Sequence, residues 1–586
     1  MLYPKLRRKS AKRLNINRFY GYDCNPGAAD GCFADTRNIS TALFPQLSTR
    51  GKRSTVRTLT CAQALAEKDA LVWVDDGMLY CNSLPTAVTG LMPGEKQLVS
   101  MGAYLCIFPD KVYFNTANQS DWGSMEAYWS YTGTVSYALC DAEGGIYSNV
   151  TGGYEEPPAP DDGDYWLDSR DGVLSCWSAD SEQWIRIDTV YTKLSFTTQG
   201  QLPAKFAQYD GVELSGTHES SLNGSKILYG IGGSAGTAPA FTDAEPDYII
   251  VQGETLSAGS CGSERITLER RVPDMDYVCQ CRNRLWGCRY GFTDEGTVNE
   301  LYACALGDFR NWNQFMGLST DSWTAGVGSD GVWTGAVNYL GTPVFFKENC
   351  LHRISVSAVG AHQVDETVCR GVEKGSGKSL AVVNETLFYK SPRDICAYQG
   401  GFPESVSAAL GAKRYHAAAA GTVGQCYYIS MLDENDMPSL FVYDMVHGLW
   451  SREDGLRAEY LAKADDRLFC LSDNKLISLT GGSGTEEEEL MWSAETGPLC
   501  LDLKKEKYIR SISLRMAAED SGECCVFVQY DSSGCWEPAG RIHGGRLPSV
   551  CSELPLRPRR CDHISIKLEG KGEMRLISLS LELTEG

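Results

Sequence analysis

One pattern recurs along this chain: a short run that alternates around apolar or aromatic residues, a polar turn, and a second such run. From Trp286 onward the centres of these hairpins advance by 59, 43, 40 and 41 residues, and a step of about 40 to 50 residues is typical of four-stranded propeller blades. One hairpin cannot bury its apolar face alone, whereas blades packed side by side share a core. The repeat therefore predicts an all-β chain containing a β-propeller, with a β-sandwich meander as the alternative. The hairpins are centred on Trp73, Leu105, Trp286, Phe345, Phe388, Tyr428 and Phe469.

The rhythm stops between Phe114 and about Val272, which predicts an inserted β-rich module. Pro- and Asp-rich residues at 154–164 mark a boundary inside it, and GGSGTEEEE after Leu479 is typical of a flexible acidic linker. Strand-like alternation then resumes and predicts a separate sandwich. The expected organisation is an N-terminal arm and opening segment at 1–54, first propeller hairpins at 55–116, the inserted module at 117–272, the remaining blades at 273–481, the linker at 482–489 and a C-terminal β-sandwich at 490–586. The stretch CAQALAEKDA near Ala62 is the one weak helix candidate.

The net charge of the chain argues against some classes of function. Lys and Arg number 54 against 75 Asp and Glu, a formal net charge of −21, so the average surface repels nucleic acid and anionic membrane. No run approaches the ~20 apolar residues that span a bilayer, and the N-terminus lacks the apolar core of a signal peptide, so we expect synthesis and folding in a cytoplasm without membrane insertion. A basic N-terminal arm is the exception, and we expect it to be a solvated tail that docks on an acidic neighbour. Its basic residues are Lys5, Arg7, Arg8, Lys9, Lys12, Arg13 and Arg18.

Residues that could carry chemistry are scattered. The 23 cysteines form no disulfide framework, and Cys279, Cys281 and Cys288 lack zinc-knuckle spacing, so we interpret them as small buried apolar residues. The seven histidines show no metal-ligand spacing, and we expect neither metal nor cofactor. Paired carboxylates of a glycosidase stay open, because such residues meet only in the fold. The candidates near turns are Asp75, Asp76, Asp321, Asp330 and Asp444.

Two further segments could be ligand-binding sites. GVEKGSGKS at 371–379 resembles a phosphate loop, but it has one residue too many before its Gly-Lys-Ser and precedes a strand pattern, so we predict a turn. The hairpin after residue 164 carries Trp166, Trp177 and Trp184. These indoles could form a sugar-stacking platform or the core of a small module, and we favour the core.

The segment Phe19–Arg53 and the step Leu306–Trp323 each carry a short motif. The first reads Arg37, Asn38, Ile39, Ser40, Phe44, Pro45, Leu47, Arg50 and Arg53; the second reads Asp308, Asn311, Trp312 and Asp321. Together they resemble virion β-propeller proteins of tailed bacteriophages, in the tail nozzle or packaged-DNA-stabilisation group. The resemblance covers the propeller portion and leaves the insertion and the C-terminal sandwich without a counterpart.

This resemblance implies a non-enzymatic structural virion protein, assembled in the host bacterial cytoplasm and forming a homo-oligomeric ring around the DNA exit path. Its partners would be other tail or neck proteins, with transient, non-specific passage of DNA along an acidic wall. Two alternatives remain. One is a carbohydrate-binding or glycan-cleaving propeller used in host attachment, and the other is a host-protein interaction scaffold unrelated to phage.

Overall fold

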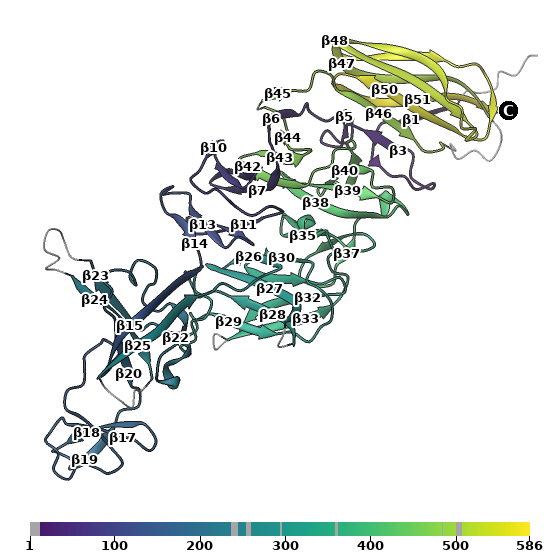
Figure 1. Ribbon diagram of the computed structural model, residues 1–586. Helices are drawn as coiled ribbons and strands as arrows, with labels where there is room; N and C mark the ends of the chain where they lie inside the picture. Colours follow the sequence, from purple (N-terminus) through teal and green to yellow (C-terminus); the bar gives the residue numbers. More distant parts are fainter. Residues whose placement is uncertain are drawn as a thin grey trace, which may run out of the picture. The chain divides into compact units, whose positions relative to one another are not determined.

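The computed structural model describes residues 12–235, 244–253, 259–293, 296–357, 361–482, 484–499 and 507–585 (Figure 1). Within these ranges the regular elements are strands, apart from three single turns of 3-10 helix: η1 (Ser220–Leu222), η2 (Gly377–Ser379) and η3 (Ala408–Leu410). No helix in the described ranges is long and apolar enough to cross a membrane. Lys5, Arg7, Arg8 and Lys9 of the basic arm lie outside the described residues. The chain forms two compact units, the first of Met1–Leu98, Gly331–Ser355 and Val364–Gly586, the second of Val99–Asp330 and Val356–Gln363.

The first unit contains a succession of antiparallel sheets that have the four-stranded blade pattern. Their hairpin turns use left-handed residues, as at Asp76–Gly77 and Asn384–Glu385, which two-residue turns require. The predicted all-β propeller is confirmed. Its blades here are β7 (Ala62–Lys68), β8 (Ala70–Asp75), β9 (Met78–Cys81) and β10 (Leu84–Pro85); β30 (Gly335–Tyr339), β31 (Thr342–Phe346), β32 (Cys350–Val356) and β33 (His362–Val368); β34 (Ala381–Val383), β35 (Thr386–Lys390), β36 (Ile395–Tyr398) and β37 (Glu404–Ser405); and β38 (Tyr415–Val423), β39 (Cys426–Asp433), β40 (Pro438–Asp444) and β41 (Leu449–Arg452).

The last blade is completed by a strand from the other end of the chain. β42 (Tyr460–Ala464), β43 (Arg467–Ser472) and β44 (Lys475–Ser478) are followed in the sheet by β6 (Ser54–Thr58), with Ser54 opposite Ser478. The segment expected to open the first hairpins therefore belongs to the last blade. The short β45 (Thr485–Glu486) pairs with β6, so the expected free linker is partly tied down.

The weak helix candidate is wrong, because Ala62–Lys68 is the strand β7. Every residue from Ala64 to Lys68 pairs with β8, and Ala64 and Leu65 are buried. Packing against neighbouring strands outweighs the helix preference of its alanines.

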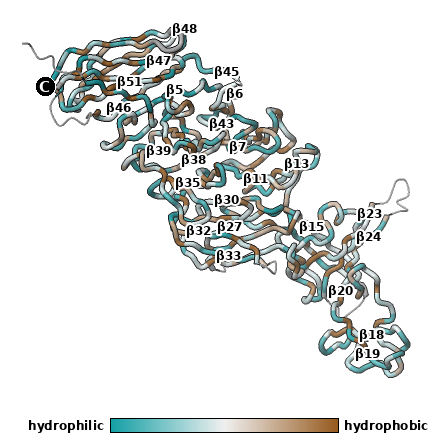
Figure 2. The backbone as a smooth tube through the Cα atoms, turned by 180° about the vertical axis from the view of Figure 1, so that it is seen from behind, coloured by the Kyte–Doolittle hydropathy of each residue, from teal (hydrophilic) through white to brown (hydrophobic). Residues whose placement is uncertain are grey.

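Apolar layers between consecutive blades form the core of this unit. In Figure 2 hydrophobic segments, coloured brown, recur along the backbone of these blades. Between β35 and β39 the rings of Phe388 and Tyr427 stack with centroids 5.2 Å apart, and both side chains are buried. Tyr427 also donates its hydroxyl hydrogen bond to Ser379 O at 2.8 Å. Each blade thus buries its face against the next one, as the repeat predicts.

The C-terminal sandwich begins at β46 (Met491–Thr496) and includes strands from the opening segment. The very long β47 (Lys507–Tyr530) pairs with β48 (Glu537–Pro555) and also with β50 (Ile564–Lys571) and the last strand, β51 (Met574–Glu585). Strand β51 also pairs with β1 (Lys12–Ile16) and β5 (Leu47–Thr49). In Figure 1 the purple N-terminal strands accordingly lie beside the yellow C-terminal ones. Phe19, Phe33 and Ile39 share one core with Leu514 and Leu568. The remaining strands are β2 (Gly21–Tyr22), β3 (Cys32–Arg37), β4 (Ile39–Ser40) and β49 (Arg560–Cys561).

The second unit holds two further blades and the insertion. A seven-stranded sheet and a small four-stranded sheet form the predicted β-rich module. The blades are β11 (Gln97–Met101), β12 (Tyr104–Phe108), β13 (Val112–Asn115) and β14 (Trp122–Ser124), and β26 (Tyr277–Cys281), β27 (Arg284–Thr293), β28 (Gly296–Ala303) and β29 (Trp323–Gly326). The large sheet is β22 (Gly224–Ile227), β21 (Gly211–Ser215), β25 (Gly259–Arg270), β15 (Ala127–Cys140), β20 (Tyr191–Ser195), β24 (Glu245–Gln252) and β23 (Gly230–Ser234); the small one is β16 (Val150–Gly153), β17 (Tyr165–Asp168), β18 (Val173–Ser178) and β19 (Gln183–Arg186).

Candidate functional site

The first motif builds a buried polar junction between the C-terminal sandwich and the β38–β41 blade. Asn38 adopts a left-handed backbone with φ 57°, which asparagine tolerates better than most residues. Its side-chain oxygen accepts a hydrogen bond from Arg50 Nε at 2.8 Å, and its side-chain amide donates to Met491 O at 2.7 Å. Its backbone amide donates to Glu453 O, just after β41. One residue therefore connects the opening segment, the sandwich and a blade.

Three carboxylates neutralise the two buried arginines of this motif. Arg50 makes a bidentate contact with Glu487, at 2.8 and 2.9 Å. Arg53 donates to Glu453 at 2.6 Å and to Asp454 at 2.7 Å, and both arginine side chains are only 5% exposed. These five side chains are called the charged junction below. Its acidic members were missed by the sequence reasoning, although two buried arginines require such partners.

The pKa values in the charged junction reflect competition between burial and ion pairing. Burial alone would raise the pKa of Asp454, but the adjacent Arg53 outweighs it and lowers that pKa. Burial would likewise raise the pKa of Glu487, and its hydrogen bonds from Arg50 and from the Arg53 amide lower it instead. For Arg53, burial favours the neutral form, yet Glu453 and Asp454 raise its pKa. These shifts all favour the charged forms of Asp454, Glu487 and Arg53.

The stability of the first unit should fall in acid because of these two carboxyl groups. Their pKa values in the folded chain lie below the ordinary 3.8 and 4.5, so their contribution is complete above about pH 5 and is lost as the pH falls through the lowered values. Urea unfolding between pH 6 and pH 2 measures this. Glu487→Gln should reduce the loss of unfolding free energy between pH 6 and pH 2. An unchanged pH profile in that variant would contradict the role given to Glu487.

The exposed part of the same motif lies on the turn before β5. Leu43 is 41% exposed, Phe44 is half-buried and Pro45 is exposed. The ring of Phe44 packs on His447 with centroids 4.8 Å apart, beside the 60% exposed Val446. Leu43 and Ser40 also line an open groove of about 590 Å³ together with Arg50 and residues of β47 and β51. The motif is therefore buried at Arg50 and Arg53 and apolar on the exposed turn. We call Leu43, Phe44, Pro45 and Val446 the apolar turn.

Arg37 lies on β3 opposite Ser493 and is exposed, so it belongs to the sandwich rather than to the charged junction.

The second motif holds a long connection between β28 and β29. Asn311 is buried; its amide donates to Tyr209 O at 2.8 Å and its oxygen accepts from Gly211 N at 3.0 Å. A Cβ at Gly211 would lie 2.3 Å from Asn313 O, so this close approach requires glycine. Trp312 is buried and donates to Phe309 O at 2.8 Å. These contacts lock the blade onto the inserted module.

The two acidic residues of the second motif accept hydrogen bonds from backbone amides. Asp308 accepts from Arg310 N at 3.1 Å, and Asp321 accepts from Leu318 N at 2.9 Å. Both side chains therefore stabilise turns.

The three tryptophans of the insertion are brought together in the β16–β19 sheet. Trp177 and Trp184 are a cross-strand pair with centroids 5.4 Å apart, and Trp166 lies 5.8 Å from Trp184. Trp166 is 6% exposed, whereas Trp177 and Trp184 are half-buried. Trp166 is therefore covered, although the apolar core of the module is built around Leu167 and Leu174, and Trp177 and Trp184 are partly exposed.

The carboxylates near turns mostly cap the backbone of those turns. Asp75 accepts from Thr60 N and Cys61 N at 2.9 and 2.8 Å. Asp444 accepts from Val446 N at 2.9 Å and contacts His447 Nδ1 at 2.7 Å. Asp76 occupies a left-handed turn position, and Asp330 is exposed.

The glycine-rich string 371–379 is a turn that ends in η2, with Lys374 and Gly375 exposed. Ser376 and Ser379 are fully buried, Ser376 Oγ accepts from Ala418 N at 3.0 Å, and Ser379 Oγ donates to Ser376 O at 2.6 Å. Both serine hydroxyls are therefore engaged within the protein, and the string forms a turn, as predicted.

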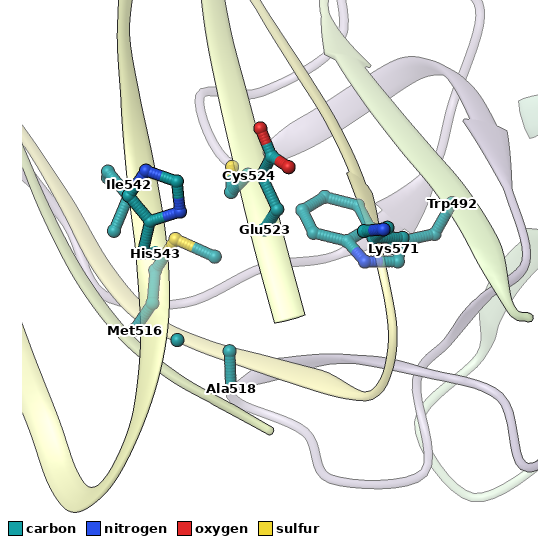
Figure 3. A pocket seen from close by; sticks show the side chains of 9 residues that line it. Trp492, Met516, Ala518, Glu523, Cys524, Ile542, His543 and Lys571 are labelled. Carbon is teal, nitrogen blue, oxygen red and sulfur yellow. The ribbon is translucent and has the colours of Figure 1, made fainter. Parts of the chain in front are cut away.

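A small cavity in the sandwich is shown in Figure 3. Apolar side chains of Met516, Ile542 and Trp492 line it together with Lys571 and His543. Its volume of about 20 Å³ holds one water molecule at most. It lies among β46, β47, β48 and β50 and is too small for an organic ligand.

No family model matches the chain, and no curated protein does. Among solved structures it is similar to the extracellular domain of a hybrid two-component system from B. thetaiotaomicron, at 9% identity and a TM-score of 0.22, covering 94% of this chain and 98% of that one. A glycoside hydrolase matches at 9% identity and a TM-score of 0.19, covering 51% and 96%. A family 43 arabinoxylan arabinofuranohydrolase from Bacillus subtilis, in complex with cellotetraose, matches at 8% identity and a TM-score of 0.18, covering 53% and 95%. None of these three is described as a phage protein, and scores this low support no argument about activity.

Proposed function

We propose that this protein is a non-enzymatic structural component of a tailed-phage or prophage virion, a ring-forming tail or neck subunit around the DNA path. The observation that carries the proposal is the double role of the segment that resembles phage propeller proteins. Its arginines Arg50 and Arg53 are locked in the charged junction, while Leu43 and Pro45 of the same segment face solvent. An apolar turn held on a rigid base suits a contact between subunits.

The overall charge agrees with this role. A formal net charge of −21 leaves few cations to trap phosphates, so a polyanionic genome could pass without adhering. Composition of purified particles tests the proposal. Quantitative mass spectrometry of particles induced from the host should find this chain at several copies per particle, in constant ratio to the other tail proteins. Its absence from intact particles would overturn the assignment.

Substitution of Leu43 tests the apolar turn. Leu43→Asp should shift the purified protein from oligomer to monomer in analytical ultracentrifugation, because a charge cannot be buried in an apolar contact without a partner. Leu84 on β10 is the matched control, since it is also an exposed leucine, at 67% against 41%. Leu84→Asp should leave the oligomer intact, and equal behaviour of the two variants would count against the apolar turn.

Glycan recognition is the second candidate, and the half-buried Trp177 and Trp184 pair favours it. Exposed indole faces stack on sugar rings, and the small sheet that carries them is separate from the charged junction. A glycan array with wild-type protein and Trp184→Ala tests it. Binding that is lost in the variant would support recognition by this pair, whereas an array without any bound glycan would remove the candidate.

A further inference from the structure

Three metal-binding side chains from two neighbouring strands meet on the β30–β33 blade. Cys350 and His352 are two residues apart on β32, so their side chains share one face of the strand. Glu366 comes from β33. One donor atom from each residue lies within 4.8 Å of the other two. These three residues are called the Cys-His-Glu cluster below.

The strand register explains why His352 and Glu366 meet. Ser357 N donates to Ala361 O at 2.8 Å, and Cys369 N donates to Asn349 O at 3.1 Å. Both bonds belong to the same antiparallel register, in which His352 lies directly opposite Glu366. Directly opposed residues have the closest side chains in a sheet. The arrangement is therefore built by the blade itself and does not depend on a surface loop.

The spacing of His352 and Glu366 suits a tetrahedral ion. Donor atoms around a four-coordinate zinc lie roughly 3.3–3.8 Å apart, given bond lengths of about 2.0–2.3 Å. His352 Nε2 and Glu366 Oε2 lie 3.4 Å apart. A thiolate, an imidazole and a carboxylate are all zinc ligands, whereas Mg²⁺ and Ca²⁺ select oxygen donors alone.

Burial and charge also suit a bound cation. Cys350 is 6% exposed and His352 is fully buried, while the Glu366 side chain is 41% exposed and leaves an approach from solvent. The ring of Trp333 packs against His352 with centroids 5.1 Å apart and fixes its plane. Lys347 Nζ lies over the ring of Trp333, 4.5 Å from its centroid. A divalent ion with one thiolate and one carboxylate is electrically neutral, so this neighbouring ammonium does not oppose it.

We propose that Cys350, His352 and Glu366 form a Zn²⁺ site with three protein ligands, which joins β32 to β33 at the outer edge of the blade. Water fills the fourth position. The inference is independent of the virion role, because it rests on the blade geometry alone. It also accounts for a buried cysteine and a buried histidine placed on one strand face.

Metal binding by the full-length protein tests the site. The apo protein, prepared with a chelator, should take up one Zn²⁺ per chain in equilibrium dialysis, and Co²⁺ should produce a thiolate-to-cobalt charge-transfer band. Cys350→Ser should abolish that band. His352→Ala should weaken Zn²⁺ binding by about 100-fold or more, and Glu366→Gln by about 10-fold or more. Even residues that only support a metal ligand contribute about 10- to 100-fold to metal affinity.

Two matched controls separate the site from adventitious binding. Cys396 occupies the corresponding third strand of the next blade and is fully buried, but Tyr398 stands where His352 would. His416 and Asp436 form an exposed pair at 3.1 Å. Cys396→Ser and His416→Ala should both keep the cobalt band and the zinc affinity. Glu366→Gln changes a partly exposed side chain and should fold even where the buried variants fail.

The proposal would be overturned if the wild-type protein took up no Zn²⁺. It would also be overturned if the cobalt spectra and metal affinities were the same in the wild type, Cys350→Ser and Glu366→Gln.

Discussion

Arg53→Met should destabilise the first unit by about 3–5 kcal/mol, the usual cost of removing one partner of a buried ion pair. Arg53 is 4% exposed and donates to both Glu453 and Asp454. The variant leaves two carboxylates in a buried site without their main counter-charge. Equilibrium unfolding in urea, followed by tryptophan fluorescence, measures the loss.

The Arg53 result has two controls. Arg452 pairs with Asp35 at 2.6 Å, but the two side chains are 33% and 51% exposed, so Arg452→Met should cost at most about 1 kcal/mol. The double variant Arg53→Met with Glu453→Gln should be more stable than additivity of the single variants predicts, because the second change removes an uncompensated charge. Equal losses in Arg53→Met and Arg452→Met would contradict the charged junction.

Tyr427→Ala should cost about 3–5 kcal/mol, because it opens a large cavity between two blades. Tyr427 is fully buried, stacks on Phe388 and donates to Ser379 O. Tyr427→Phe keeps the ring and leaves that carbonyl without this donor, so about 1–3 kcal/mol should be lost.

Differential scanning calorimetry of the tyrosine variants measures both effects. Tyr428, the next residue, lies on the other face of β39 and contributes to a different core layer. If the blades pack on each other through this ring, Tyr427→Ala should be the least stable protein, Tyr427→Phe intermediate and the wild type the most stable. A Tyr427→Ala variant as stable as Tyr427→Phe would show that the two blades do not share this core.

The blades could be predicted from the sequence because each one is local. A blade's strands follow one another within about forty residues, and their apolar alternation is visible in hairpins such as the one around Phe388. The closing strand Ser54–Thr58 could not be found in this way. Its partner β44 is more than four hundred residues away, and five polar or β-branched residues contain no signal for a distant register.

The same difference between local and distant contacts limits prediction of the site. The arginines of the first motif were identified, and so were Asn311 and Trp312 of the second, because each stands in a recognisable string. Glu453 and Glu487 were missed, since acidic residues at turns and in a linker are normally solvated and nothing nearby marks these two as buried partners. Glu366 was missed for a similar reason, because it meets His352 only through the pairing of β32 with β33.

Negative-stain electron microscopy of the purified protein tests the central claim, that this propeller is a structural subunit which assembles through its motif segment. We expect closed rings of several copies for the wild type and separate particles for Leu43→Asp. A wild-type protein that stays monomeric at high concentration, with no ring in any field, would contradict it.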